Sequence, residues 1–140
     1  MTTEQTIEFV VADTTVLSYL TRSSRHSQDY LALIGTRRIV VPFVARVELD
    51  GKDWGQVRRD SLDALLATCV LVDQSVATGA WFNLAATKRR ELSLISGVGD
   101  NDLWIVATAG EHSAPLVRND RNQAQIARGL GITVLTALRA

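Results

Sequence analysis

One stretch of the chain reads Ser96-Gly97-Val98-Gly99-Asp100-Asn101-Asp102 and continues without a break as Leu103-Trp104-Ile105-Val106-Ala107-Thr108-Ala109. A loop broken by two glycines ends in two carboxylates and becomes an apolar segment without Gly or Pro. This predicts a helix buried on nearly all sides. If Asp102 opens the first turn, helical spacing places Ile105, Val106 and Ala109 on its face. An acid that only balances the helix dipole is the simpler interpretation, so other acids must join Asp102 before a site can be inferred.

Composition predicts one globular domain over residues 1–140, long enough at 15.3 kDa to bury a core. Fifteen Lys and Arg balance fifteen Asp and Glu, and this zero net charge argues against a protein that coats duplex DNA. No apolar run approaches a membrane span, and the polar start is unlike a signal peptide, so we expect a cytoplasmic protein without membrane contact. The single cysteine, Cys69, lies in an apolar run and is expected to be a buried hydrophobic residue.

Strand-like and helix-like segments alternate along the chain. Short runs of β-branched and apolar residues predict strands at 7–12, 38–41, 69–72, 116–117 and 132–135. Helical spacing and Gly or Pro boundaries predict helices at 16–20, 29–34, 43–52, 56–68, 75–91, 102–109 and 123–128. The alternation predicts an α/β fold, a three-layer α/β/α arrangement with a central parallel sheet of about five strands.

Two of these helices carry apolar stripes that predict which face is buried. In 43–52 one face holds Val44, Val47, Glu48 and Gly51, so that Glu48 interrupts the stripe. In 75–91, the longest helix, the residues expected to point inward are Val76, Ala80, Leu84 and also Trp81.

Four carboxylates lie where a parallel sheet binds ligands, at the carboxyl ends of its strands. Asp13 directly follows the first strand and Asp120 follows the fourth. Glu48 lies one or two helical turns past the second strand, and Asp102 opens the helix that leads to the fourth. Acids on four separate elements can therefore meet in one crevice. Because their mutual repulsion would raise some of their pKa values, we expect a bound cation.

The chemistry of these ligands favours a hard metal. All-oxygen ligation suits Mg²⁺, with Mn²⁺ as a possible substitute, whereas His26 and His112 lack metal-ligand spacing. Magnesium bridges carboxylates to substrate phosphates, which indicates phosphodiester or phosphoryl chemistry with water as the nucleophile. No GxxxxGK[ST] loop, GxGxxG turn or GxSxG elbow is present. A phosphatase or another magnesium-dependent phosphoryl-transfer enzyme stays open at this point.

The order of these residues resembles the PIN-domain ribonucleases, and within them the VapC-type toxins of bacterial toxin–antitoxin pairs. The resemblance covers residues 10–135, and its most specific part is Gly99-Asp100-Asn101-Asp102 leading into the apolar helix. It implies a metal-dependent endoribonuclease with a parallel-sheet α/β/α fold. The catalytic and metal-binding residues that it implies are the acidic quartet Asp13, Glu48, Asp102 and Asp120.

The resemblance also implies supporting residues. Thr15 would hold the orientation of the Asp13 carboxylate. Asp100 is either a further ligand or the N-cap of the helix that follows it, and the cap is the favoured interpretation. Trp104 is expected in the core or at a subunit interface rather than as a base-stacking platform.

The chain departs from the family pattern near its fourth acid. Arg118 stands where the family often has Thr or Ser, and its guanidinium would either grip an RNA phosphate or pair with Asp120. Asn122 and Gln123 stand where an acid and an aromatic residue are frequent. These departures favour an alternative function, a catalytically weak PIN-fold module that binds RNA or protein without cutting.

Partners follow from the resemblance as well. It implies an RNA substrate, a small antitoxin protein that blocks the site, and a homodimer. DNA would be bound only through the antitoxin, which agrees with the neutral charge. The polar stretch 21–28 is a candidate edge of the antitoxin groove, to be probed with Leu17→Asp or Leu31→Asp.

Overall fold

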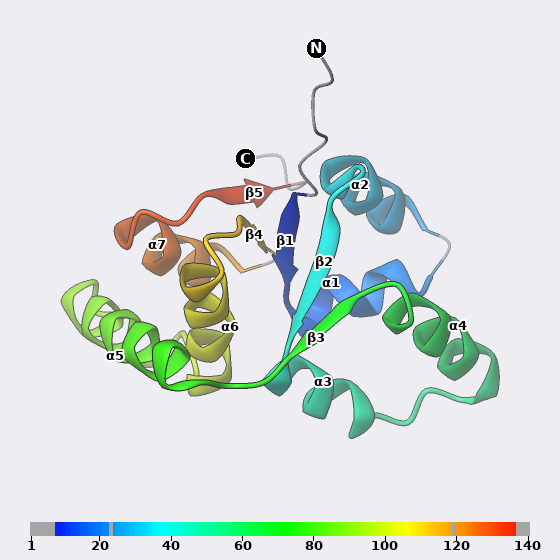
Figure 1. Cartoon of the computed structure of the whole chain (residues 1–140), viewed down its shortest axis with the longest axis horizontal. Helices are drawn as coiled ribbons and strands as arrows, with labels where there is room; N and C mark the ends of the chain where they lie inside the picture. Colours follow the sequence, from blue (N-terminus) through cyan, green and yellow to red (C-terminus); the bar gives the residue numbers. More distant parts are fainter. Residues whose placement is uncertain (1–7, 23, 119, 137–140) are drawn as a thin grey trace, which may run out of the picture.

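The chain folds around one parallel sheet (Figure 1). The structure, a computed structural model, describes residues 8–22, 24–118 and 120–136, apart from the Arg118 side chain. The strands are β1 (Phe9–Ala12), β2 (Arg38–Pro42), β3 (Val70–Val72), β4 (Leu116–Arg118) and β5 (Val134–Thr136). The helices between them are α1 (Thr14–Leu20), α2 (Arg25–Ile34), α3 (Phe43–Asp50), α4 (Gln56–Leu66), α5 (Val76–Glu91), α6 (Asp100–Glu111) and α7 (Arg121–Gly129).

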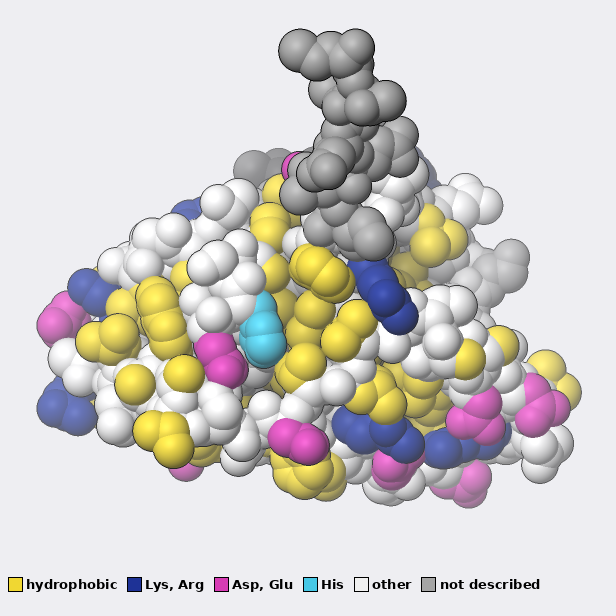
Figure 2. All heavy atoms as spheres, in the orientation of Figure 1, with side chains coloured by type: hydrophobic (Ala, Val, Ile, Leu, Met, Phe, Trp, Pro, Cys, Tyr) yellow, Lys and Arg dark blue, Asp and Glu magenta, His cyan; other side chains and the backbone are white. Residues whose placement is uncertain are grey.

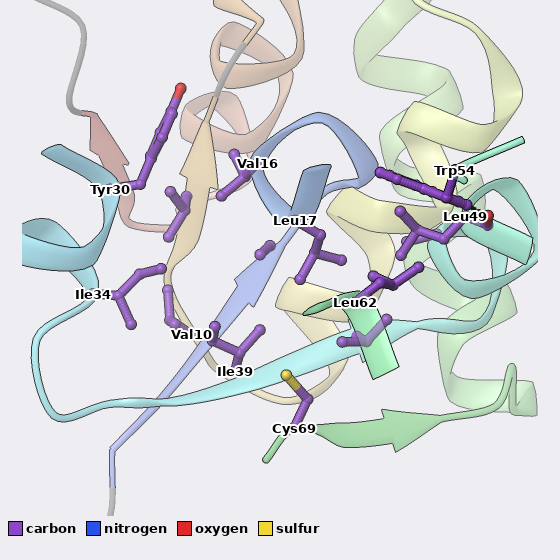
Figure 3. Packing of buried hydrophobic residues seen from close by; sticks show 14 residues of the cluster. Val10, Val16, Leu17, Tyr30, Ile34, Ile39, Leu49, Trp54, Leu62 and Cys69 are labelled. Carbon is purple, nitrogen blue, oxygen red and sulfur yellow. Dashed lines mark hydrogen bonds between the residues drawn. The ribbon is translucent and has the colours of Figure 1, made fainter. Parts of the chain in front are cut away.

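Alternate residues of the central strands point into two separate cores. Val10 and Ala12 of β1 join the core formed with α1, α2 and α4, whereas Val11 joins the core formed with α5, α6 and α7. Figure 3 shows Val10 beside Ile39 of β2 in the first of these cores. Cys69 also lies there, and burial raises the pKa of its thiol, as expected for an unreactive hydrophobic residue. The predicted three-layer α/β/α fold is therefore confirmed.

The strand order β3-β2-β1-β4-β5 defines where a ligand site can form. The chain builds outward from β1 to β3, then returns to the other side of β1 to add β4 and β5. Every neighbouring pair is parallel, and Val11 of β1 pairs with Leu116 of β4. The direction of winding reverses between β1 and β4, so the carboxyl ends of these two strands flank the crevice in which such sheets bind ligands.

The buried faces of two helices differ from those predicted. In α3 the buried residues are Ala45 and Leu49, and Val47 is 53% exposed. In α5 Thr78 and Ala85 are buried, whereas Val76 and Leu84 are exposed. Trp81 and Val44 pack against the core as predicted, but the other apolar positions predicted to face inward were wrong because apolar residues lie all around both helices, so the partner element selects the face.

The partner of α5 shows how that selection works. Trp81 packs directly over Gly110 of α6, where an added Cβ would lie 2.4 Å from the indole ring. Only a glycine leaves room for the ring, so this contact sets the rotation of α5 about its axis.

Helix α2 begins four residues earlier than predicted. Ser24 caps its start, and the hydroxyls of Ser24 and Ser27 exchange hydrogen bonds with each other's backbone N–H groups. Half of the polar stretch 21–28 is therefore helical. None of the helices in the described segments combines the length and apolar composition that a membrane crossing requires.

Candidate functional site

Asp13 lies at the junction of β1 and α1 and caps the helix. Its Oδ1 accepts a hydrogen bond from the Val16 N–H at 2.8 Å, and the residue is 6% exposed. Burial raises the pKa of Asp13 to about 6 against the lowering effect of the Val16 hydrogen bond. The value of about 6 also includes repulsion from Asp102, Glu48 and Asp120, so these three acids lie close enough to influence the Asp13 carboxylate.

Asp120 caps the helix that follows β4. Its Oδ1 accepts from the N–H groups of Asn122 at 2.7 Å and Gln123 at 3.1 Å. Since β4 is the parallel neighbour of β1, the two capping carboxylates stand at the same edge of the sheet.

Asp102 lies in the first turn of α6, as predicted. Its Oδ2 accepts from the N–H of Gly99, the N-cap residue, at 3.3 Å. Burial raises the pKa of Asp102, and repulsion from Asp120 and Glu48 adds to it, while the Gly99 hydrogen bond lowers it. The apolar segment behind it is buried on nearly all sides, which confirms the prediction for this stretch.

Glu48 reaches the same edge from α3. Its Oε1 accepts a hydrogen bond from the Thr14 hydroxyl at 3.0 Å, which ties α3 to the start of α1. Residues other than Thr15 hold the carboxylates in this part of the site. The backbone of Val16 holds Asp13, Thr14 holds Glu48, and the Thr15 side chain forms no hydrogen bond with any described residue.

Each of the four acids uses one carboxylate oxygen in a hydrogen bond within the fold. The oxygens without a hydrogen bond to any described residue are Asp13 Oδ2, Glu48 Oε2, Asp102 Oδ1 and Asp120 Oδ2. No described cationic side chain forms an ion pair with any of them. Four neighbouring carboxylates with no cation paired to them among the described residues are a donor set suited to a hard divalent ion.

The arrangement limits how many of these groups can coordinate one ion. Within the described ranges, no three Asp, Glu, His or Cys side chains are placed so that they could hold a metal together. Magnesium is commonly held by one or two carboxylates and completes its shell with waters and substrate phosphates. The residues present therefore fit a partly hydrated ion rather than a closed protein cage.

Asp100 differs from its predicted role. Gly99 occupies the N-cap position, and Asp100 is an exposed residue of the first turn whose Oδ1 accepts from Arg89 Nη1 at 3.0 Å. The same Arg89 nitrogen donates to the Val98 carbonyl at 3.0 Å, so it ties the glycine-containing loop to α5. The N-cap prediction was wrong because glycine adopts the required extended conformation without a side-chain cap.

Two predictions near the fourth acid have different outcomes. Arg118 ends β4 opposite Thr136, but its side chain and the whole of Asn119 lie outside the described structure. Trp104 packs against Phe82 of α5, with ring centroids 4.2 Å apart, and so belongs to the α5–α6 contact.

Gln123 is a site residue whose role was not predicted. It is fully buried, and its Nε2 donates to the Asp102 carbonyl oxygen at 3.2 Å while its backbone N–H donates to Asp120. Its Oε1 is buried and has no hydrogen-bond partner in the structure. The pattern Asp120-x-x-Gln123 is a capping signal, yet the glutamine side chain reaches another helix instead of its own N-cap.

The fold and these acids define a class of protein, an α/β/α domain with an acid-lined edge at the reversal point of a parallel sheet. A family model described as PIN domain matches residues 10–129. The chain therefore belongs to the PIN domain family, whose members are generally nucleases that use divalent metal ions. No curated protein sequence matches the chain.

Solved structures with the same fold include toxin–antitoxin complexes. VapBC2 from Rickettsia felis, bound to a DNA fragment from its promoter, has 19% identity and a TM-score of 0.72, with 91% of this chain and 98% of that chain covered. VapBC-1 from nontypeable Haemophilus influenzae has 17% identity and a TM-score of 0.69, covering 94% and 99%. A toxin–antitoxin complex from Klebsiella pneumoniae has 21% identity and a TM-score of 0.66, covering 94% and 99%.

Proposed function

We propose that the protein is a Mg²⁺-dependent endoribonuclease and the toxin of a type II toxin–antitoxin pair. The observation that carries the proposal is the group of four carboxylates at the carboxyl edge of the sheet, none of which forms an ion pair with a described residue. Membership of a nuclease family and the shared fold with toxin–antitoxin complexes support the same function.

The four acids take different parts in this proposal. Asp13 and Asp102 are the proposed direct ligands of Mg²⁺ or Mn²⁺, and Glu48 and Asp120 complete the site directly or through water. When bound, the ion supplies a polarised phosphate and a water of lowered pKa. The backbone N–H groups of Val16 and Gly99 each hold one carboxylate oxygen, of Asp13 and of Asp102, which leaves the second oxygen of each acid for the ion.

The proposed partners are an RNA substrate, a second copy of the chain and a small antitoxin, all met in the cytoplasm, with DNA bound only through the antitoxin. Leu31 of α2 is 53% exposed and is a sound probe of the antitoxin groove, whereas Leu17 is fully buried. Leu17→Asp would place a charge in the core, so only loss of antitoxin binding by Leu31→Asp supports the groove. A short neighbouring gene for a DNA-binding protein is the corresponding genetic expectation.

Cleavage of RNA by the purified protein tests the catalytic proposal. We expect cleavage with Mg²⁺ that EDTA stops, and no cleavage of single-stranded DNA of the same sequence. Asp13→Asn and Asp102→Asn should each reduce the rate at least about 100-fold, because each removes a metal-binding charge. Asp50→Asn, which removes an acid paired with Arg46 and Arg59, is the matched control and should cleave normally. An Asp102→Asn protein with full activity would exclude the proposal.

A second candidate is a PIN-fold module that binds RNA without cutting it. The absence of three converging ligand groups among the described residues favours this alternative. RNA binding by the wild-type protein without metal-stimulated cleavage would select it.

A further inference from the structure

The sequence holds three clusters of adjacent basic residues, Arg37-Arg38, Arg58-Arg59 and Lys88-Arg89-Arg90, and these clusters differ in whether carboxylates balance their charge. Arg58 and Arg59 are adjacent on α4, yet only Arg59 pairs with carboxylates. It contacts Asp50 at 3.2 Å and Asp63 at 3.2 Å. The basic residues of the other clusters that form ion pairs are Arg37, Lys88 and Arg89. No carboxylate in the described structure pairs with Arg58.

Neutral groups hold the Arg58 guanidinium in place instead. Its Nη2 donates to the hydroxyl of Thr21 at 3.0 Å and to that of Ser18 at 3.4 Å, both on or next to α1. Its Cζ lies 4.6 Å from the ring centroid of Trp54, and its buried Nε has no partner. Partial burial lowers the pKa of Arg58, and the neighbouring Arg22 lowers it further. The cation is therefore fixed in position without a counter-charge from any residue that the structure describes.

Two further cations lie nearby, Lys52 over the Trp54 ring and Arg22 close to Arg58. Lys52 Nζ is 5.8 Å from the Trp54 ring centroid, and Arg22 is close enough to Arg58 to affect its ionisation. Neither forms an ion pair with any residue that the structure describes. Trp54 is itself immobilised, since its Nε1 donates to the Leu49 carbonyl at 2.7 Å, and Figure 3 shows the two side chains lying together.

This basic group, consisting of Arg22, Lys52 and Arg58, stands next to the acids. Ser18 follows Thr14 by one turn of α1, and Lys52 follows Glu48 by four residues, two residues past the end of α3. Thr14 and Glu48 are themselves hydrogen-bonded at the acidic edge. One helical turn is about 5 Å along the axis, so the basic group begins roughly one turn beyond the acids.

We propose that Arg22, Lys52 and Arg58 form a subsite for the RNA backbone that binds a phosphate beside the one to be cleaved. This inference rests on the proposed function, since it assumes an RNA substrate. A polyanion entering a crevice of four carboxylates is repelled unless cations compensate nearby, and this group supplies three that no described acid neutralises. Because neutral hydroxyls and an indole hold Arg58, its charge is available to a phosphate.

Binding of a fluorescent single-stranded oligouridylate to the full chain in EDTA tests the subsite without cleavage. Arg22→Ala and Lys52→Ala should each weaken binding about 3- to 10-fold at low salt, and each should reduce the slope of log affinity against log salt by about 0.7. Arg58→Gln should do the same. Arg22 and Lys52 are exposed, so their variants report on binding even if loss of Arg58 loosens α4.

Arg59→Ala is the matched control, because it removes an adjacent arginine that two carboxylates already neutralise. It should retain the wild-type affinity and salt slope. The subsite is excluded if Arg22→Ala and Lys52→Ala bind as the wild type does, or if the wild type binds no RNA. It is also excluded if the variants lose only the binding of a protein partner.

The two proposals fail separately. RNA binding that depends on the basic group, in a wild-type protein that never cleaves with Mg²⁺, would retain the subsite and exclude the nuclease. Metal-dependent cleavage with unchanged RNA affinity in all three variants would retain the nuclease and exclude the subsite.

Discussion

Carboxylates in two parts of the molecule differ in whether a cation of the chain lies beside them. On the α3–α4 face, Asp50 lies between Arg46 at 3.4 Å and Arg59 at 3.2 Å. Figure 2 shows Lys and Arg side chains interspersed with Asp and Glu over these helices, at the lower right. At the carboxyl edge of the sheet, Asp13 and Asp102 are bound by backbone N–H groups and by no described cation.

This difference separates acids whose charge is balanced by described cations of the same chain from acids whose charge is not. A backbone N–H orients a carboxylate and satisfies one oxygen, but it leaves the full negative charge. Burial and repulsion from the neighbouring acids raise the pKa values of Asp13 and Asp102, and no ion pair with a described residue offsets this rise. The acids at this edge therefore need a cation from outside the chain to balance their charge. The acids of the α3–α4 face are already balanced by arginines of the chain.

The largest expected effect is on the free energy of unfolding, which should depend on pH because of Asp13. In the metal-free folded protein its pKa is about 6, against an ordinary value of 3.8, so the native state binds more protons between these pH values. The free energy of unfolding therefore falls as pH rises through this window, by about 3 kcal/mol for the full shift. Asp13→Asn should lack this fall and be the more stable protein above pH 6 in EDTA, as measured by urea denaturation.

The substitution is suited to this test because asparagine is as good an N-cap as aspartate and keeps an acceptor for Val16. Asp50→Asn, on the paired face, should leave the pH dependence of stability near that of the wild type. Equal pH profiles for the wild type and Asp13→Asn would contradict the electrostatic difference between the two regions. Adding Mg²⁺ at pH 7 should stabilise the wild type more than Asp13→Asn.

A smaller effect is expected from Gln123, which links Asp102 to Asp120. Gln123→Met keeps the length of the side chain but removes the donor to the Asp102 carbonyl. We expect Mn²⁺ affinity to fall about tenfold, the scale seen when a residue that orients a ligand is removed. Calorimetric titration with Mn²⁺ measures this affinity for the wild type and for Gln123→Met.

The control for Gln123→Met is Gln125→Met, an exposed position on the same helix that should bind Mn²⁺ as the wild type does. Stability of Gln123→Met should change by less than about 1 kcal/mol, because the substitution also removes an unpaired buried oxygen. Unchanged Mn²⁺ affinity would show that α6 alone positions Asp102.

The smallest effect is expected on the paired face. Arg59→Ala removes two ion pairs from a side chain that is 36% exposed, and such surface pairs contribute less than about 1 kcal/mol each. Thermal denaturation should show a shift of at most a few degrees, and the shift should shrink in high salt. A loss comparable to the Asp13 effect would mean that the two regions do not differ as described.

The fold was predictable from local features of the sequence. The strand at β1 reads as a continuous apolar run because both of its faces are covered, and its alternate residues enter different cores. The inward faces of α3 and α5 were not predictable in the same way, since Trp81 finds its place against Gly110 of another helix. Periodicity within one helix carries no information about such a contact.

The candidate site was predictable in part, for a physical reason. Asp13 and Asp120 follow strands, and a parallel sheet brings the carboxyl ends of its strands to one edge. The hydrogen bond from Gln123 to Asp102 spans 21 residues, and that from Arg58 to Ser18 spans 40. Such side-chain contacts depend on the final packing, so neither the linking glutamine nor the basic group around Trp54 is visible in the spacing of residues.

The pairing of Val11 with Leu116 joins the first strand of the chain to the fourth. Synthesis on the ribosome proceeds from the N-terminus. Strand β1 therefore cannot pair with β4 until most of the chain has emerged. Asp120 and the helix that it caps appear later still. In the proposed nuclease the acidic edge would therefore be complete only after nearly the whole chain has been made.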